Sequence, residues 1–230
     1  MRQARVPRPP KSVREQMRAE EGRLDPDAEA NVDAVANPRS APRYKERIAE
    51  ATRSFEKEHY FDARREFASL ANDLPDVANV RELHGLSLYR LGRWAEAINE
   101  LEAHRSLTGS VEHLAVLADC YRARKRYSKV DELWAELKAA SPSAALVAEG
   151  RIVAAGAMAD RGDLRGALAV MNSAETVPRK VRDHHIKMWY VLGDLYDRSG
   201  EVVRAREFFK RVQIEAPGYA DVEDRLSALR

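Results

Sequence analysis

The chain of 230 residues lacks the features that mark a secreted or membrane protein. It has one cysteine, Cys120, so an internal disulfide is excluded. It has no apolar run near the ~20 residues of a membrane-spanning helix, and its basic first residues are not followed by the apolar stretch of a secretory signal. These absences predict a cytoplasmic protein that has no contact with a membrane.

The motifs of common enzymes are missing as well. The sequence has no P-loop, GxGxxG, HExxH or paired CxxC motif. The adjacent His184 and His185 would point about 100° apart on a helix, whereas two metal ligands on one face need a spacing of three or four. Cys120 lies beside Leu117 and Tyr121 on an apolar segment, which favours a buried structural thiol over a nucleophile. The sequence therefore predicts no enzymatic activity, metal site, cofactor or small-molecule substrate.

What the chain does have is a recurring pattern, in a composition of 44% hydrophobic and 33% charged residues that suits one elongated core. In the segments 84–97 and 192–205, a small residue is followed seven positions later by a glycine and, five positions after that, by an alanine. These positions are Gly85, Gly92 and Ala97 in the first segment and Gly193, Gly200 and Ala205 in the second. Such self-similarity is typical of helical repeat proteins.

The pattern resembles that of the tetratricopeptide repeat (TPR), W-x2-L-G-x2-Y…A-x3-F…P. The last copy fills every consensus position, with Trp189, Leu192, Gly193, Tyr196, Ala205, Phe209 and Pro217. Across all copies the alanine position recurs at spacings of 34, 33, 37 and 38 residues, at Ala63, Ala97, Val130, Ala167 and Ala205. The resemblance covers roughly Tyr44 to Tyr219 and makes the chain similar to uncharacterised bacterial TPR-repeat proteins.

The resemblance implies an all-α fold, a right-handed superhelical α-solenoid of about five TPR helix pairs over residues 43–219 with a C-terminal capping helix over 220–230. Each pair has an apolar face that it cannot bury alone, so neighbouring pairs stack and share a core. Small residues such as Gly85 and Gly193 let paired helices approach closely. Glycine suits the turn between the helices, although Glu58 stands there in the first copy.

The first 42 residues differ in composition and predict a disordered, Pro-rich arm with segregated charge. They contain six of the ten prolines and no aromatic residue. Basic residues gather at the start, and acidic residues follow over 20–33. The basic residues that could contact nucleic acid or an acidic surface are Arg2, Arg5, Arg8, Lys11 and Arg14. Two readings stay open, a solvated tail and an electrostatic arm.

In TPR arrays the first helix of each repeat lines a concave groove, so the resemblance also implies a binding surface. The residues at matching positions are Phe55, Glu82, Leu86, Tyr89, Arg90, Asp119, Arg122, Lys187, Tyr190 and Asp194. Their mixture of aromatic, apolar and charged side chains favours a peptide or helix of another protein as the ligand. The leading prediction is thus a protein-protein interaction scaffold or adaptor whose partner is unidentified.

A nucleic-acid-associated factor is the alternative prediction. It would use the basic arm together with the basic loop over residues 179–187, which contains Arg179, Lys180 and Arg182. Binding through phosphate contacts would weaken steeply with salt, whereas apolar burial in a groove would change little.

Overall fold

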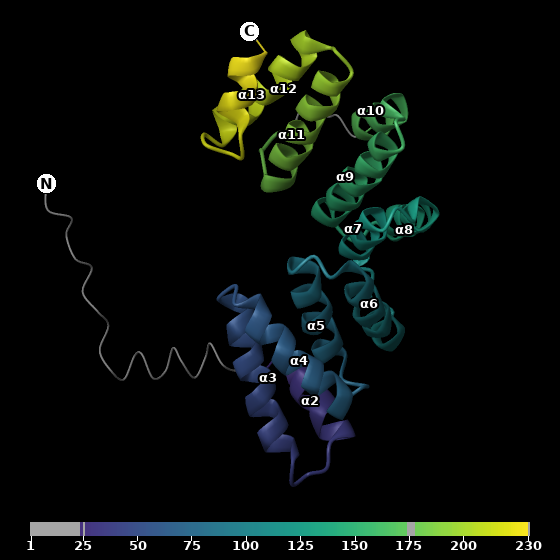
Figure 1. The fold of residues 1–230 in the computed structure, drawn as a ribbon, viewed down its shortest axis with the longest axis vertical. Helices are drawn as coiled ribbons and strands as arrows, with labels where there is room; N and C mark the ends of the chain where they lie inside the picture. The colour runs from purple at the N-terminus through teal and green to yellow at the C-terminus, as the bar shows by residue number, and fades with distance from the viewer. Residues whose placement is uncertain (1–23, 25, 174–177, 230) are drawn as a thin grey trace, which may run out of the picture. The chain divides into compact units, whose positions relative to one another are not determined.

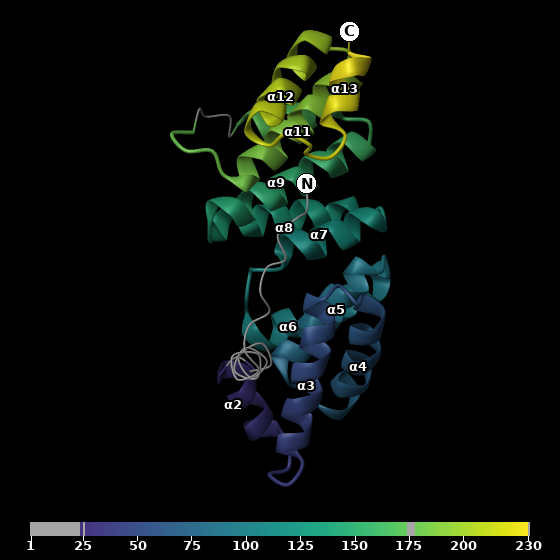
Figure 2. The same ribbon diagram turned by 90° about the vertical axis from the view of Figure 1, so that its left-hand side faces the viewer.

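The computed structural model describes residues 24, 26–173 and 178–229. These residues form twelve α-helices, α2 to α13, and contain no strand (Figures 1 and 2). The chain divides into two compact units, an N-terminal unit over Met1–Gly109 and a C-terminal unit over Ser110–Arg230. The described helices confirm the predicted all-α helical-repeat fold.

The N-terminal unit contains two helix pairs preceded by a shorter helix. Its helices are α2 (Pro26–Val35), α3 (Ala41–Glu56), α4 (Tyr60–Asp73), α5 (Ala78–Arg90) and α6 (Trp94–Thr108). Helix α4 packs against both α3 and α5, α5 packs against α6, and α2 packs against α3 and α5. The core between these helices includes the fully buried side chains of Ile48, Phe67 and Val80. The site described below lies along α5 and where α3 ends and α4 begins.

The C-terminal unit contains three further pairs and a last short helix. Its helices are α7 (Leu114–Ala123), α8 (Tyr127–Ala140), α9 (Ala144–Asp160), α10 (Leu164–Asn172), α11 (Asp183–Arg198), α12 (Val202–Glu215) and α13 (Val222–Ala228). The first helices of successive pairs contact one another, α7 with α9 and α9 with α11, and α13 packs on α12. Met171, Tyr196 and Phe209 are among the side chains buried in its core.

The same turn joins the two helices of all five described pairs. One residue of each turn has a positive φ, between +57° and +85°, and these residues are Glu58, Gly92, Lys125, Gly162 and Gly200. The backbone N–H of the next residue donates to the carbonyl five positions earlier, as in the 2.9 Å bonds from Arg93 to Leu88 and from Glu201 to Tyr196. This bond is the signature of the Schellman motif, which satisfies the free carbonyls at a helix end.

The small residues of the repeat lie where two paired helices touch. A Cβ atom added to Gly85 would lie 2.8 Å from Cγ of Leu101, and one added to Gly193 would lie 2.8 Å from Cε1 of Phe209. In both pairs the large side chain comes sixteen residues after the glycine, so the same contact recurs at the same repeat position. Glycine is therefore required here by the distance between helices, since each of these two has ordinary helical backbone.

The helical part of the chain begins earlier than the predicted boundary at residue 42. Helix α2 lies within the predicted disordered arm, and its Ala28 and Val32 are buried, Val32 completely. Two small apolar side chains one turn apart are enough to hold a short helix on α3 and α5, although the segment has no aromatic residue. Residues 1–23 and 25 of the predicted arm lie outside the described residues.

Replacing Lys125 with glycine should stabilise the protein. A non-glycine residue at positive φ costs about 1–2 kcal/mol, of which the greater backbone entropy of unfolded glycine offsets about 0.5–1 kcal/mol. Urea denaturation of Lys125→Gly should thus show a free energy of unfolding about 0.5–1 kcal/mol above that of the parent. Gly92→Ala, at φ +71°, is the reverse control and should lower it. A loss of stability in Lys125→Gly would contradict this account of the turn.

Helix α2 provides a matched pair of valines for a second prediction. Val32→Ala should lower the free energy of unfolding by about 1–3 kcal/mol, because it opens a cavity in the core of the N-terminal unit. Val35→Ala, on the same helix but 44% exposed, should change it by less than about 0.5 kcal/mol. Equal effects of the two substitutions in thermal or urea denaturation would show that α2 does not belong to the folded unit.

Candidate functional site

The predicted groove residues of the N-terminal unit lie along α5 and at the end of α3. Glu82, Leu86 and Tyr89 are half-buried, and Arg90 is exposed at the end of α5. The rings of Tyr89 and Trp94 meet edge to face, with centroids 5.5 Å apart. Their spacing of four and three residues places Glu82, Leu86 and Tyr89 on one face of the helix. This face presents an apolar centre between polar ends.

Aromatic side chains and an arginine gather at the end of these helices. The ring of Phe55 meets that of Tyr60 edge to face at 5.4 Å, and the guanidinium of Arg90 lies 5.7 Å from the Tyr60 centroid. Tyr60 also lines a surface pocket of about 360 Å³ together with Phe61 and Leu91. We call Phe55, Tyr60, Phe61, Arg90 and Leu91 the aromatic surface.

Phe61 was not predicted from the sequence, and it is the most exposed aromatic feature of this surface. Its side chain is 72% exposed, on the first turn of α4, and the guanidinium of Arg64 lies 5.7 Å from its ring. Tyr60 occupies the aromatic position of the repeat, and the next residue on a helix points about 100° away from it. An aromatic residue directly after the repeat's aromatic position therefore points away from the core, and this spacing could have identified Phe61 as exposed.

Arg122 of the C-terminal unit is held by neighbouring acidic side chains. Its Nε donates to Asp160 at 2.7 Å, and its Nη1 lies 3.4 Å from Asp119. Burial alone would lower the pKa of Arg122, but the two carboxylates outweigh it and raise the pKa. The guanidinium also fills the space beside Gly156, where a Cβ would lie 2.7 Å from it. The bond from Arg122 to Asp160 thus joins α7 to α9, whereas Asp119 holds Arg122 from within α7.

Two more predicted groove residues of this unit form ion pairs between helices. Lys187 lies 3.1 Å from Glu149, and Asp194 lies 2.9 Å from Arg225. The guanidinium of Arg225 also lies 5.0 Å from the Phe209 ring, so it connects α13 with α11 and α12. Such partly exposed pairs each contribute modestly to stability, about 0–1 kcal/mol. They orient the helices. Their charges are already paired, so a ligand would have to compete with the existing partners.

Tyr190, predicted as a groove contact, lies between α11 and the C-terminal segment. Its hydroxyl donates to the carboxylate of Asp221, and its ring meets those of Phe209 and Tyr219 edge to face at 5.7 and 5.6 Å. Burial and the bond to Asp221 raise the pKa of Tyr190 to about 12. This tyrosine therefore has a packing role that its sequence position did not reveal.

The single cysteine and a buried histidine have structural surroundings. Cys120 is fully buried, and burial together with the charge of Asp119 raises the pKa of its thiol to about 12. His84 is also buried, with Nδ1 3.4 Å from Oε1 of Glu100, which Arg81 contacts at 2.8 Å. Burial favours a raised pKa for Glu100, but His84 and Arg81 outweigh it and lower the pKa. For Cys120, burial thus favours the protonated thiol over the nucleophilic thiolate.

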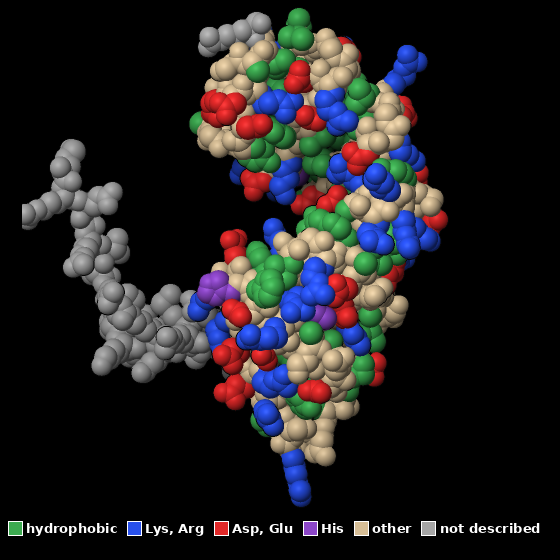
Figure 3. Space-filling model, in the orientation of Figure 1, with side chains coloured by type: hydrophobic (Ala, Val, Ile, Leu, Met, Phe, Trp, Pro, Cys, Tyr) green, Lys and Arg blue, Asp and Glu red, His purple; other side chains and the backbone are tan. Residues whose placement is uncertain are grey.

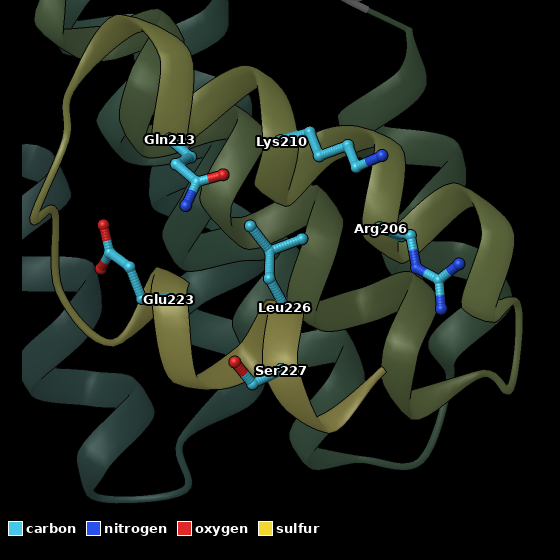
Figure 4. Close-up of a pocket in the computed structure, with 6 residues that line it drawn as sticks. All are labelled: Arg206, Lys210, Gln213, Glu223, Leu226 and Ser227. Carbon is cyan, nitrogen blue, oxygen red and sulfur yellow. The ribbon is translucent and has the colours of Figure 1, made fainter. Parts of the chain in front are cut away.

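The C-terminal unit has an open pocket of about 640 Å³ between α12 and α13 (Figure 4). Arg206, Lys210 and Gln213 line it from α12, and Leu226 lies across from them on α13. The charged ends of Lys210 and Glu223 point away from each other in Figure 4. The polar groups of this pocket therefore do not converge on one ligand atom.

The structure describes only one of the two groups of basic residues that were predicted to contact nucleic acid or an acidic surface. Arg179, Lys180 and Arg182 are exposed in the segment that precedes α11. Arg2, Arg5, Arg8, Lys11 and Arg14 lie outside the described residues.

In Figure 3 the visible surface carries basic, acidic and hydrophobic side chains interspersed over both units. No helix of the described chain is long and apolar enough to span a membrane.

Tyr190 provides a test of these assignments. Tyr190→Phe should lower the free energy of unfolding by about 1 kcal/mol through loss of the bond to Asp221, because the ring contacts remain. Tyr190→Ala should lower it by about 3 kcal/mol, because the contacts with Phe209 and Tyr219 are lost as well. Urea denaturation measures both. If Tyr190→Ala is as stable as the parent, the side chain is not part of the packing and remains available as a groove residue.

Comparisons with known proteins agree with the helix-pair architecture. No protein-family model matches the chain, and no curated protein matches it. The structure is similar to that of a thermophilic TPR protein from Thermus thermophilus, with a TM-score of 0.61 and 16% sequence identity. The match covers 81% of this chain and 98% of that protein. The chain therefore has the fold of a tetratricopeptide-repeat protein.

Proposed function

We propose that this protein is a protein-interaction scaffold that holds a peptide or helix of a partner protein against the N-terminal unit. The observation that carries the proposal is the aromatic surface, where Phe61 is 72% exposed beside a pocket of about 360 Å³. Phe61 lines this pocket together with Tyr60 and Leu91, and a contiguous apolar patch rimmed by polar residues is often a contact site. The TPR fold supports a protein as the partner, because helical repeats present extended surfaces to ligands.

The composition of the aromatic surface suits protein recognition. Aromatic and arginine side chains dominate the binding energy of protein interfaces, since they combine a large contact area with a polar group. Phe55, Tyr60 and Arg90 already lie in contact, so their positions require little ordering when a partner binds. Leu91 adds an apolar wall to the pocket. An apolar side chain of the partner is the complementary ligand.

The contacts of the predicted groove residues favour the N-terminal unit over the C-terminal unit as the main contact. Arg122, Lys187 and Asp194 are paired with charges on neighbouring helices, and Tyr190 is bonded to Asp221. A ligand would have to displace these partners. Leu86 and Arg90, by comparison, lie on a helix face with accessible apolar and cationic groups.

Comparative affinity capture tests the proposal. Full-length parent and the double variant Phe61→Ala/Arg90→Ala are used to capture proteins from a lysate of the source organism, with mass spectrometry as the readout. The double variant should retain at most one tenth of the captured partner, which corresponds to at least about 1.4 kcal/mol of binding energy. Nuclease treatment should leave the captured amount unchanged, whereas its loss would indicate a nucleic-acid-mediated complex.

Exposed apolar residues of the other unit are the matched control. Val203 and Ile214 are 82% and 75% exposed on α12, so Val203→Ala/Ile214→Ala removes comparable apolar area elsewhere. This control should capture the partner as well as the parent does. If both double variants lose capture equally, or if neither does, the aromatic surface is not the contact site. Circular dichroism establishes that each variant is folded.

A further inference from the structure

A second pocket in the C-terminal unit lies away from the predicted groove residues. It has a volume of about 350 Å³ and is formed by the turn after α8 and the first two turns of α9 and α11. Val147 and Met188 give it an apolar wall, and Met188 is only 7% exposed. We call it the α9/α11 pocket. It is large enough for one or two amino-acid side chains.

The polar lining of the α9/α11 pocket contains hydroxyl, imidazole and guanidinium groups and no carboxylate. These groups belong to Ser141, Ser143, Arg151, His184 and His185. Arg179, Lys180 and Arg182 are exposed in the segment that leads into α11, so they add positive charge nearby. Two acidic residues are close in sequence to this lining: Glu149 of α9, which is paired with Lys187, and the exposed Asp183 in the first turn of α11, and the cationic groups outnumber them. The pocket therefore has a net positive field.

Arg151 is the strongest charge in this lining, and its bonds leave that charge uncompensated. Its Nη1 donates to the carbonyl of Val170 at 2.6 Å and to the hydroxyl of Ser173, and its Cζ lies 5.3 Å from the Trp134 centroid. No carboxylate within the described part of the chain is paired with it. Burial lowers the pKa of Arg151, as expected for a cation without an anionic neighbour. An anion in the pocket would supply the missing partner.

His185 also has a donor group that is not used in its bond to the backbone. The Nδ1 atom of His185 accepts the backbone N–H of Arg182 at 3.0 Å, so the neutral ring carries its proton on Nε2. The centroids of His184 and His185 are 4.1 Å apart. Burial, the charge of His184 and the charge of Arg182 lower the pKa of His185. The Nε2–H group of this neutral ring can donate a hydrogen bond to an anion while Nδ1 keeps its bond to Arg182.

Two helix termini add to the field. The pocket extends over the first two turns of α9 and α11, helices of 17 and 16 residues. The partial positive charge at a helix N-terminus favours an anion there. Ser143 caps α9 through the backbone N–H of Leu146, which keeps the turn beside the pocket ordered.

We propose that the α9/α11 pocket binds an acidic side chain of an extended peptide, with the anion at Arg151 and the adjacent His184 and His185 and a neighbouring apolar side chain against Val147 and Met188. The anion is a carboxylate or a phosphate monoester, because both accept several hydrogen bonds from such donors. The cationic lining and the apolar wall together select an acidic residue beside an apolar one. The proposal rests on the proposed function only in that the ligand belongs to a protein.

Fluorescence anisotropy with the full-length protein tests this proposal. The probes are labelled peptides with blocked ends and the sequence Ala-Leu-Xaa-Leu-Ala, in which Xaa is Glu, phosphoserine or Gln. At least one acidic peptide should bind tenfold or more tightly than the Gln peptide. The ratio of affinities for the Glu and phosphoserine peptides identifies the preferred anion. Equal affinity for all three peptides, or no saturable binding, would overturn the proposal.

Variants locate the binding within the pocket. Arg151→Gln and His184→Gln should each weaken binding of the preferred acidic peptide at least fivefold. Lys180→Gln, which removes an exposed charge outside the lining, should change it less than twofold. Arg151 also bonds to the end of α10, so Arg151→Gln could weaken binding by loosening that helix. His184→Gln removes a lining group without this contact and therefore tests the pocket separately. An equal loss in all three variants would show diffuse attraction and no specific pocket.

The test also separates this proposal from the proposed function. The double variant Phe61→Ala/Arg90→Ala should bind the acidic peptide as the parent does, because none of its changes lies in the α9/α11 pocket. Peptide binding that survives in this variant, together with lost capture of the partner, would support two separate surfaces. Peptide binding lost in this variant would overturn the assignment to the pocket.

Discussion

The close approach of two helices within each pair is the constraint on which the rest of the structure depends. Gly85 faces Leu101, and Gly193 faces Phe209, at distances that a Cβ atom would not allow. A turn with one residue at positive φ then reverses the chain so that these positions meet. Close contact provides the dense packing that a thin layer of helices needs, since each pair buries only its inner faces. Where the turn residue is Glu58 or Lys125, the fold tolerates backbone strain to preserve this contact.

The inner faces of the helices form the core, and the side chains on their outer faces make different contacts in the two units. In the C-terminal unit, charged residues such as Arg122 and Asp194 bridge successive helices, and Tyr190 bonds to the segment before α13. In the N-terminal unit, aromatic side chains and Arg90 meet at the ends of the helices and leave Phe61 exposed. At these positions, the same repeat therefore pairs side chains with neighbouring helices in the C-terminal unit and presents aromatic and cationic side chains in the N-terminal unit. The difference comes from substitutions at positions that the core does not constrain.

The sequence predicted the repeat positions well and the site only in part. Leu192, Tyr196 and Phe209 are buried as the repeat pattern requires. Among the predicted groove residues, Leu86, Tyr89 and Arg90 could be located because helix periodicity alone places them on one face. The roles of Arg122 and Tyr190 could not be predicted, because their partners Asp160 and Asp221 are 38 and 31 residues away. Phe61 and the α9/α11 pocket were missed for related reasons, since one is outside the consensus and the other combines three segments.

The sequence by itself determined the helical class, the pairing of helices and the identity of the core positions. These follow from local rules, the spacing of small and large residues and the turns between them, which repeat along the chain. It did not determine that Val32 joins the first unit, because a short polar helix with two buried apolar side chains has little local signal. Nor did it determine which charges are paired and which donors converge on a pocket. Tertiary structure decided these, because an ion pair or a pocket depends on distances between residues that are remote in the chain, and periodicity carries no information about those distances.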